Sequence, residues 1–370
     1  MGERRSVRVA RFSFRPTGAI ESGVGEAFDA DAAAMKGAMM KHAAILLAAT
    51  MVLGITCAAE SADLALPQPP SSDIKSVRLI EPHGGRARYV FGGERFKAFK
   101  PYVDELLSPN GVNPLRDNVA DHIHHHALMY AVAVDGVDFW SETKNCGRQV
   151  QRGIVTAARS VNGQSVSAVT AENDWTKPDG KTVVATEKRT IELYSNPKAV
   201  GPTLISWRTR LAPPAGAESI KLTGSHYFGL GMRFVKSMDN ASTFLFADPN
   251  AKGLTVRGDE RLTPSAWAAC TGAADGNTVT VAMFDHPDNP RPVLWFSMGK
   301  SFSYLSATIN LWKDPLVVKA GEELAVCYGV AVWDGEATRE QIDAACKQWR
   351  KLAPSLKDGN KQHAKDKEPS

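Results

Sequence analysis

The chain has 370 residues, of which 43% are hydrophobic and 23% are charged, and its formal net charge at pH 7 is +4. These values are typical of a globular protein with a sizeable core, arranged as one large or two ordinary domains. The positive charge is small and dispersed, and no basic stripe alternates with aromatic residues. We therefore expect no nucleic-acid partner.

The first 62 residues are expected to lie outside the folded domain. A short basic region and an apolar stretch over 43–55 are followed by small residues, which is the order typical of a secretory signal peptide. We predict a spurious or disordered extension over 1–34, a signal peptide over 35–62, and a periplasmic or secreted mature protein with no transmembrane segment. Cys57 leaves a lipid-anchored form open as an alternative.

A proline-rich linker is predicted over 63–74, and alternation of apolar and polar residues dominates from there to about residue 335. Glycine, proline, asparagine and aspartate separate the alternating segments. The predicted strands are 75–80, 88–91, 128–134, 154–158, 165–170, 182–194, 203–211, 278–284, 293–296, 304–311 and 323–332. Short strands separated by turn signals favour an all-β sandwich or barrel.

One amphipathic helix is predicted near the end of the chain, over 338–352. Its apolar residues recur at helical spacing: Ile342, Ala345, Cys346 and Trp349. The lysine-rich residues 354–370 are predicted to form a disordered tail. The sequence thus predicts a single domain over 75–353. Its class is all-β, a large antiparallel β-sandwich with a C-terminal helix, and the mutarotase-like supersandwich is one form of that fold.

Four of the nine histidines fall within five residues, at His122, His124, His125 and His126, directly after Asp121. In an extended segment the first, second and fourth would share one face, and His125 would lie on the other. Neutral imidazoles bind metals and exchange protons near neutral pH. His122 and His124 could therefore hold a divalent metal if a third ligand came from elsewhere. The alternative is a set of surface or core histidines at a strand entry.

Two further segments carry polar side chains that could take part in a site. Asp285, His286 and Asn289 lie where a predicted strand enters a proline-rich loop, although a rigid turn would use the same residues. Tyr227 and Arg233 flank two glycines that permit close backbone approach. Arginine can grip an oxygen-rich ligand with two hydrogen bonds, and the alternative is a bulged strand with a core aromatic residue.

Several common catalytic motifs are missing from the sequence. There is no Gly-x-Ser-x-Gly elbow, Walker loop, dinucleotide-binding fingerprint or His-Glu-x-x-His. Four cysteines follow the predicted signal peptide, at Cys146, Cys270, Cys327 and Cys346. They permit three disulfide pairings, and buried free thiols are an equal alternative.

Three segments together resemble a bacterial family named methane oxygenase PmoA-like, which is also described as a domain of unknown function. They are the stretch from Lys100 through the histidine cluster to Trp140, the segment 227–234, and the segment 285–290 with Trp295. Ile123 replaces the proline of the family pattern, and Phe228 replaces a glycine. The resemblance covers about residues 85–350 and implies a secreted β-sandwich domain linked to sugar metabolism, unlike the membrane-spanning monooxygenase subunit.

These observations predict a histidine-rich site that acts on or binds carbohydrate, either a small molecule or an oligosaccharide. The candidate acid–base residues are His122, His124, His125, His286 and Asp285. The candidate substrate-binding residues are Arg233, Tyr227 and Asn289. The alternative is a non-catalytic periplasmic module that binds a metal, through His122 and His124, or a sugar.

Overall fold

The computed structural model describes residues 74–81, 83–117, 119–196 and 201–357. All of them belong to one compact unit, Ala65–Ser370. The predicted extension, the signal peptide, the lipid-anchoring cysteine, nearly all of the linker and the tail beyond residue 357 lie outside the described residues. Within the described ranges, no helix is both long enough and apolar enough to span a bilayer.

The described strands form three antiparallel sheets. The nine-stranded sheet runs in the order β1 (Lys75–Ile80), β2 (Arg86–Gly92), β3 (Tyr102–Leu107), β4 (Leu128–Ala131), β12 (Gly229–Arg233), β19 (Tyr304–Thr308), β18 (Leu294–Met298), β15 (Arg261–Pro264) and β14 (Leu254–Thr255). The eight-stranded sheet runs β13 (Thr243–Phe246), β16 (Trp267–Ala274), β17 (Asn277–Asp285), β21 (Leu324–Asp334), β10 (Thr203–Ala212), β9 (Val183–Tyr194), β8 (Gln164–Thr176) and β7 (Arg148–Val161).

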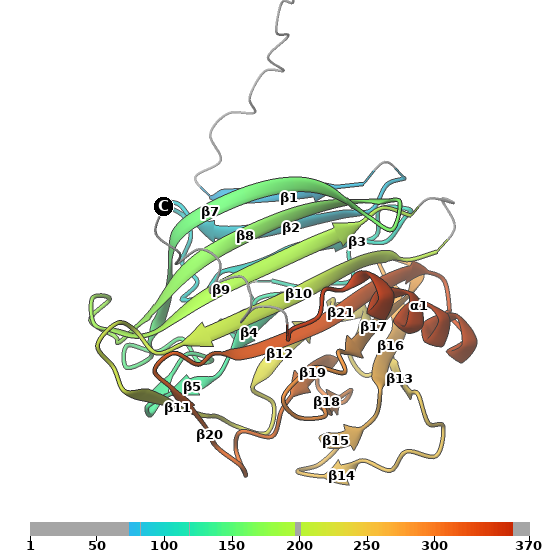
Figure 1. The fold of residues 1–370 in the computed structure, drawn as a ribbon. Helices are drawn as coiled ribbons and strands as arrows, with labels where there is room; N and C mark the ends of the chain where they lie inside the picture. Colours follow the sequence, from blue (N-terminus) through green and yellow to red (C-terminus); the bar gives the residue numbers. More distant parts are fainter. Residues whose placement is uncertain (1–73, 82, 118, 197–200, 358–370) are drawn as a thin grey trace, which may run out of the picture. The chain divides into compact units, whose positions relative to one another are not determined.

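A smaller sheet, a 3₁₀ turn and one α-helix complete the described fold. The four-stranded sheet runs β20 (Leu316–Lys319), β11 (Ser219–Thr223), β5 (Ala133–Val134) and β6 (Val137–Asp138). A 3₁₀ turn, η1, covers Lys236–Met238, and the helix α1 covers Arg339–Leu352. Figure 1 shows the long strands β7 to β10 and β21 side by side in front of β1 to β3, with α1 against the end of β21.

The main core fills the space between the two large sheets. Inward-facing residues of the eight-stranded sheet, such as Ile191 and Trp207, belong to the same buried cluster as Leu230 and Leu305 of the nine-stranded sheet. Alternation along each strand supplies this apolar face. Arg189 is an exception, because its guanidinium lies between the sheets and is paired with Glu187 at 2.8 Å.

A second buried cluster joins α1 to the opposite face of the eight-stranded sheet. Ile342 and Trp349 of the helix pack there with Phe284 and Ala331 of the strands. The helix begins at a capping box, in which Thr338 and Gln341 exchange side-chain-to-backbone hydrogen bonds. Its apolar stripe faces the sheet, as its 3.6-residue spacing predicts.

The predicted fold class is confirmed: the described chain is an antiparallel β-sandwich with a C-terminal helix. β1 matches its predicted bounds, and α1 starts one residue later than predicted. Several strands were not predicted, among them β3, β11 and β16. The four described cysteines are all buried free thiols.

Candidate functional site

The histidine cluster forms a turn rather than a strand. The backbone N–H of His125 donates to the carbonyl of His122 at 2.8 Å, and Ala127 adopts a φ of 30° before β4 begins at Leu128. The extended alternation considered from the sequence is therefore wrong. The ring centroids of His122, His124 and His125 instead lie 4.5–5.8 Å from one another.

His126 points away from the other three into a buried polar network. Its Nδ1 lies 2.7 Å from Asp117 Oδ1 and its Nε2 lies 2.9 Å from Glu142 Oε1. Two carboxylate partners require both ring nitrogens to carry protons, and they raise the pKa of His126 even though burial alone would lower it. Tyr102 stacks on the ring and donates its hydroxyl to Asp117. His126 therefore anchors the turn.

Lys100 connects this network to the backbone of the turn. Its ammonium is fully buried and donates to Glu142 Oε1 at 2.7 Å, to the carbonyl of Trp140 at 2.8 Å and to that of His124 at 3.4 Å. Burial alone would raise the pKa of Glu142, but the hydrogen bond from His126 and the charge of Lys100 lower it to about 2. The turn thus rests on a fixed ionised carboxylate.

The other three histidines open onto one cavity of about 320 Å³. The strands β18 and β19 and the loop between them form one wall, and the segments before β12 and β15 contribute to another. The lining residues are His122, His124, His125, Tyr227, Arg257, Glu260, Phe296, Met298, Ser301, Phe302 and Tyr304. A small cavity of this size, with aromatic walls and a few polar groups, is typical of a small-molecule site.

Two of these imidazoles stay neutral at physiological pH. Burial, with the nearby positive charge of Lys100, lowers the pKa of His124 to about 4. Burial, with the neighbouring histidines, lowers the pKa of His125 to about 2. His122 has a carboxylate beside it, since its Nδ1 lies 3.0 Å from Asp121 Oδ2. The cluster therefore presents hydrogen-bonding groups rather than a patch of positive charge.

Several buried polar atoms around the cavity have no hydrogen-bond partner among the described residues. They are the hydroxyl of Tyr304, Nδ1 of His125, Nε1 of Trp140, and Nε and Nη1 of Arg233. Leaving such an atom unpaired costs about 1–3 kcal/mol. Tyr304 and His125 line the cavity, so their unpaired atoms are the ones among these that a polar ligand could satisfy, whereas Trp140 and Arg233 lie behind the lining.

Glu260 is the carboxylate on the cavity wall, and it is 4% exposed. Its Oε2 lies 3.1 Å from Nε2 of His226, and its Oε1 accepts a hydrogen bond from Arg257 at 2.6 Å. Two donors on its two oxygens hold the carboxylate in place. The site therefore combines a held carboxylate with neutral imidazoles, which is a set of groups able to accept and donate protons.

Arg233 supports the cavity from behind. Its guanidinium lies over the ring of Phe302 at 3.7 Å, and its Nη2 lies 3.6 Å from Asp239. The side chain is 2% exposed, and Phe302 rather than Arg233 lines the cavity. Arg233 therefore lies next to the predicted site, with Phe302 between it and the cavity.

Asp285, His286 and Asn289 do not join this cavity, contrary to the arrangement inferred from the sequence. His286 packs edge-on against Trp349 of α1, and its Nδ1 accepts from the backbone of Asp288. Asn289 bonds to Asp285 and to the backbone of Cys327. β17 lies in the eight-stranded sheet and its end faces α1. The loop after β17 therefore packs against the helix, on the face of that sheet that points away from the main core.

The described residues contain no group of three or more histidine, cysteine, aspartate or glutamate side chains arranged to hold a metal ion. Three imidazoles gather at the turn, but their rings stack and cross one another at 15–76°. A divalent metal at His122 and His124 therefore stays a prediction.

Sequence reasoning missed most of the cavity wall and its support. Glu260 comes from one segment and Phe302 and Tyr304 come from another, and Lys100 and Glu142 lie 42 positions apart. Lys100 stood at the start of a segment that suggested the family resemblance, but nothing in the spacing indicated a buried ion pair. Apart from the histidine cluster, a short-range signal pointed to Tyr227, which the structure does place on the cavity.

The fold and site define an antiparallel β-sandwich with a histidine-lined cavity beside β18 and β19. The chain belongs to the family of unknown function DUF6807, whose model matches residues 83–347. A comparison with curated proteins found no match.

Matches to solved structures were found at low identity and with TM-scores below 0.5. A GH36 α-galactosidase from Geobacillus stearothermophilus is 12% identical, with 70% of this chain and 41% of the α-galactosidase covered and a TM-score of 0.44. This chain thus spans about two fifths of that enzyme's length. A galactose mutarotase-like protein from Clostridium acetobutylicum is also 12% identical, with 70% and 98% covered and a TM-score of 0.39.

Proposed function

We propose that the cavity at the histidine turn binds a neutral sugar, either a monosaccharide or the end unit of an oligosaccharide, and exchanges protons with it. The observation that carries this proposal is the cavity's composition. Neutral imidazoles, a single held carboxylate, an unpaired tyrosine hydroxyl and aromatic rings share one small space.

The charge of the cavity favours a neutral ligand over an anion. His124 and His125 are uncharged at neutral pH, and the negative charge of Glu260 is offset by Arg257. Hydroxyl groups both donate and accept hydrogen bonds, so sugar hydroxyls can pair with the neutral imidazoles. They can also pair with the Tyr304 hydroxyl, which has no partner among the described residues. The rings of Tyr227, Phe296 and Phe302 supply apolar surface for the C–H face of a sugar.

The same groups support acid–base catalysis. Glu260 can accept a proton from a sugar hydroxyl or carbon, and an imidazole of the turn that lines the same cavity can relay a proton. Asp121 lies 3.0 Å from His122 and would orient that ring. Glycoside hydrolysis ordinarily uses two carboxylates about 5–10 Å apart across the scissile bond. Glu260 is the one carboxylate among the described lining residues, so the site favours isomerisation by proton transfer.

The test is turnover of a panel of neutral aldoses and ketoses in D₂O, followed by proton NMR. Isomerisation through a carbon acid incorporates deuterium at that carbon, whereas interconversion of anomers changes the anomeric signals without incorporation. We expect one of these two signals with the wild-type protein. Glu260→Gln should lower the rate at least a hundredfold, within the range that general acid–base groups contribute.

The matched control is Glu94→Gln, which changes an exposed carboxylate outside the cavity. It should leave both the rate and the thermal transition unchanged. Binding without turnover would remove the catalytic part of the proposal. Absence of any sugar binding, with the cavity intact, would remove the proposal altogether.

A non-catalytic metal-binding module is the second candidate function. It is favoured by one observation, the close grouping of three histidines of which two are neutral and therefore ready to act as ligands. Elemental analysis of untagged protein tests it. Stoichiometric metal that is lost in the His122→Ala/His124→Ala variant would support this candidate over the sugar-binding site.

We infer that the mature domain is exported to the periplasm or secreted, as the basic, apolar and small residues over 35–62 indicate. The resemblance to the PmoA-like family supports a sugar-related role in the envelope. Fractionation of cells that produce the full chain tests the export.

A further inference from the structure

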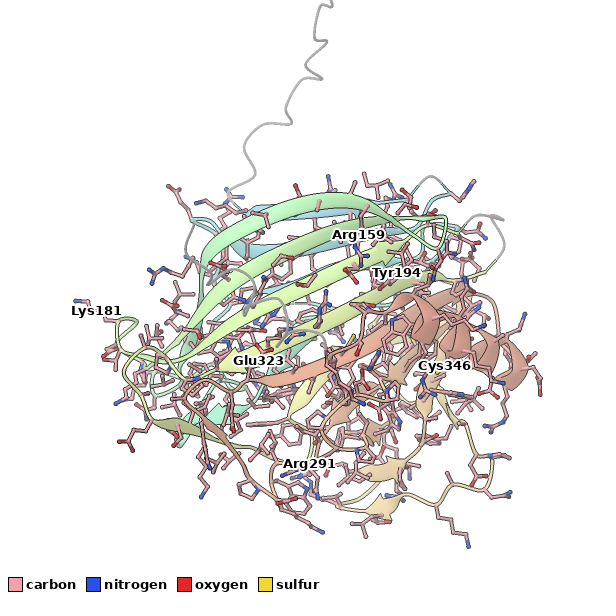
Figure 2. All side chains as sticks on the ribbon, in the orientation of Figure 1. Arg159, Lys181, Tyr194, Arg291, Glu323 and Cys346 are labelled. Carbon is pink, nitrogen blue, oxygen red and sulfur yellow. The ribbon has the colours of Figure 1, made fainter. Side chains whose placement is uncertain are left out.

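A second cavity, of about 520 Å³, lies beside α1 and shares no lining residue with the histidine-lined cavity. It is bordered by the first residue of β8, the end of β9, the start of β10, the end of β21 and one side of α1. Figure 2 labels Tyr194, which lines this cavity, and Cys346 on the neighbouring helix. The function proposed above makes no use of this cavity.

The polar side chains of the second cavity are mainly amides. Gln164 is 9% exposed, and its buried Oε1 has no hydrogen-bond partner among the described residues. Gln341 and Gln348 project from α1 to the same cavity. The Oε1 of Gln341 is held by the N–H of Thr338 at 2.8 Å, which leaves its amide nitrogen to donate. The cavity therefore offers both a buried acceptor and donors.

The described lining of the second cavity carries little charge, and part of it is aromatic. Its described lining includes no lysine, arginine or histidine. Asp334 is the lining carboxylate, and both of its oxygens are occupied, by the hydroxyl of Ser108 and the N–H of Asn110. Trp333 and Tyr194 line the cavity, and the Tyr194 hydroxyl is fixed by Glu192 and Ser206. The Tyr194 ring is thus held rigidly beside the cavity, where 2% of the residue is exposed.

From this composition we propose that the second cavity is a binding site for a neutral saccharide, separate from the histidine-lined cavity. Amides match the donor and acceptor pattern of sugar hydroxyls, and Trp333, the more exposed of the two aromatic residues at 7%, supplies apolar surface for a pyranose ring. Anionic ligands lack a cationic partner among the described lining residues. The buried Oε1 of Gln164 is the group that a sugar hydroxyl would satisfy.

The test measures binding of named probes to the full chain by calorimetry and saturation-transfer NMR. The neutral probes are cellohexaose, maltohexaose and xylohexaose, each with its monosaccharide, and hexagalacturonate is the anionic probe. A neutral hexapeptide of glutamine, serine and glycine represents the other ligand that pairs with amides. We expect at least one neutral hexasaccharide to bind and the anionic and peptide probes not to bind.

Two variants locate the binding at the second cavity. Ala344→Trp places a large side chain at an exposed position on the cavity wall, and Gln164→Leu removes the buried acceptor. Each should weaken hexasaccharide binding at least tenfold. Lys347→Trp is the matched control, because it adds the same side chain at an exposed position of α1 outside the cavity, and it should leave binding unchanged.

The His124→Ala/Glu260→Gln variant separates this proposal from the one made for the first cavity. It should lose turnover and retain the hexasaccharide binding that Ala344→Trp weakens. The proposal is overturned if no neutral hexasaccharide binds or if the peptide binds in its place. It is also overturned if Gln164→Leu and Ala344→Trp both leave glycan binding intact.

Discussion

Nε2 of His126 lies 2.9 Å from Oε1 of Glu142, the same oxygen that accepts a hydrogen bond from Lys100 at 2.7 Å. One carboxylate oxygen thus holds both the last histidine of the cluster and the lysine that reaches the backbone of His124. The arrangement separates the cluster into one histidine that anchors the turn and three that face the cavity.

Removing the charge of Glu142 should destabilise the fold. Glu142→Gln leaves the fully buried Lys100 without its carboxylate partner, and breaking a buried ion pair in this way typically costs about 3–5 kcal/mol. Urea unfolding measures the change. Glu94→Gln, at an exposed position, should stay within about 0.5 kcal/mol of wild type. A similarly small change for Glu142→Gln would contradict the anchoring role.

The stability of the domain should fall on acidification below about pH 6.5. Burial lowers the pKa of His124 to about 4 and that of His125 to about 2, whereas both titrate near 6.5 in the unfolded chain. The unfolded state therefore binds more protons in this interval. The contribution of these two histidines is fully present above about pH 6.5 and is lost as the pH falls towards the folded values.

His125→Gln tests that pH dependence. Between about pH 6.5 and pH 4, the free energy of unfolding of the variant should fall by about 1–3 kcal/mol less than that of the wild type. His126 contributes with the opposite sign, because its pKa is raised, so its contribution is present below about pH 6.5 and is lost as the pH rises through the folded value. His83→Gln, at an exposed position, should keep the wild-type profile. Unfolding curves at several pH values decide the outcome.

Gly231→Ala should disturb the cavity through Tyr304. A Cβ at this position would collide with the Tyr304 hydroxyl and approach the Trp140 ring, and overpacking of this kind costs about 1–3 kcal/mol. Sugar binding should weaken as Tyr304 moves. Adding Tyr304→Phe removes the colliding oxygen and should restore part of the stability. Gly153→Ala is the control, since its Cβ would meet Glu172 at an ordinary 3.5 Å.

His286→Ala should lower stability without changing sugar binding, and His124→Ala should weaken sugar binding without changing stability. His286 packs on Trp349 and accepts a hydrogen bond from Asp288, so its loss should lower stability by about 1–3 kcal/mol and leave sugar binding unchanged. His124 lines the cavity, so its loss should weaken binding with little effect on the thermal transition. Reduced binding by stable His286→Ala protein would place the Asp285–Asn289 loop back in the site.

The features that could be read from the sequence are those set by local periodicity. Alternation predicted β1 and the long strands β9, β10 and β21, and the 3.6-residue spacing of Ile342 and Trp349 predicted α1. These patterns identify which face of an element is buried, because the period of each element places its apolar side chains on one face. β3 was not predicted because its buried residues come in pairs rather than alternating, and β16 was not predicted because most of its residues are small.

The candidate site was only partly predictable. The sequence located the histidine cluster and Tyr227, but the conformation of the cluster depends on partners far along the chain. Lys100 and Glu142 hold the turn from outside it, and their pairing overrides the extended form that the following apolar run suggested. The position of His286 likewise depends on β17 lying next to β21 and beneath α1.

The sequence by itself determined the antiparallel sandwich, the C-terminal helix and the presence of a histidine cluster. The tertiary structure alone decided that His122, His124 and His125 meet Glu260 and Tyr304, that His126 is buried with Glu142, and that a second, amide-lined cavity forms beside α1. Periodicity is a property of neighbouring residues, whereas a cavity wall is assembled by sheet order and strand register, which bring together residues separated by more than a hundred positions.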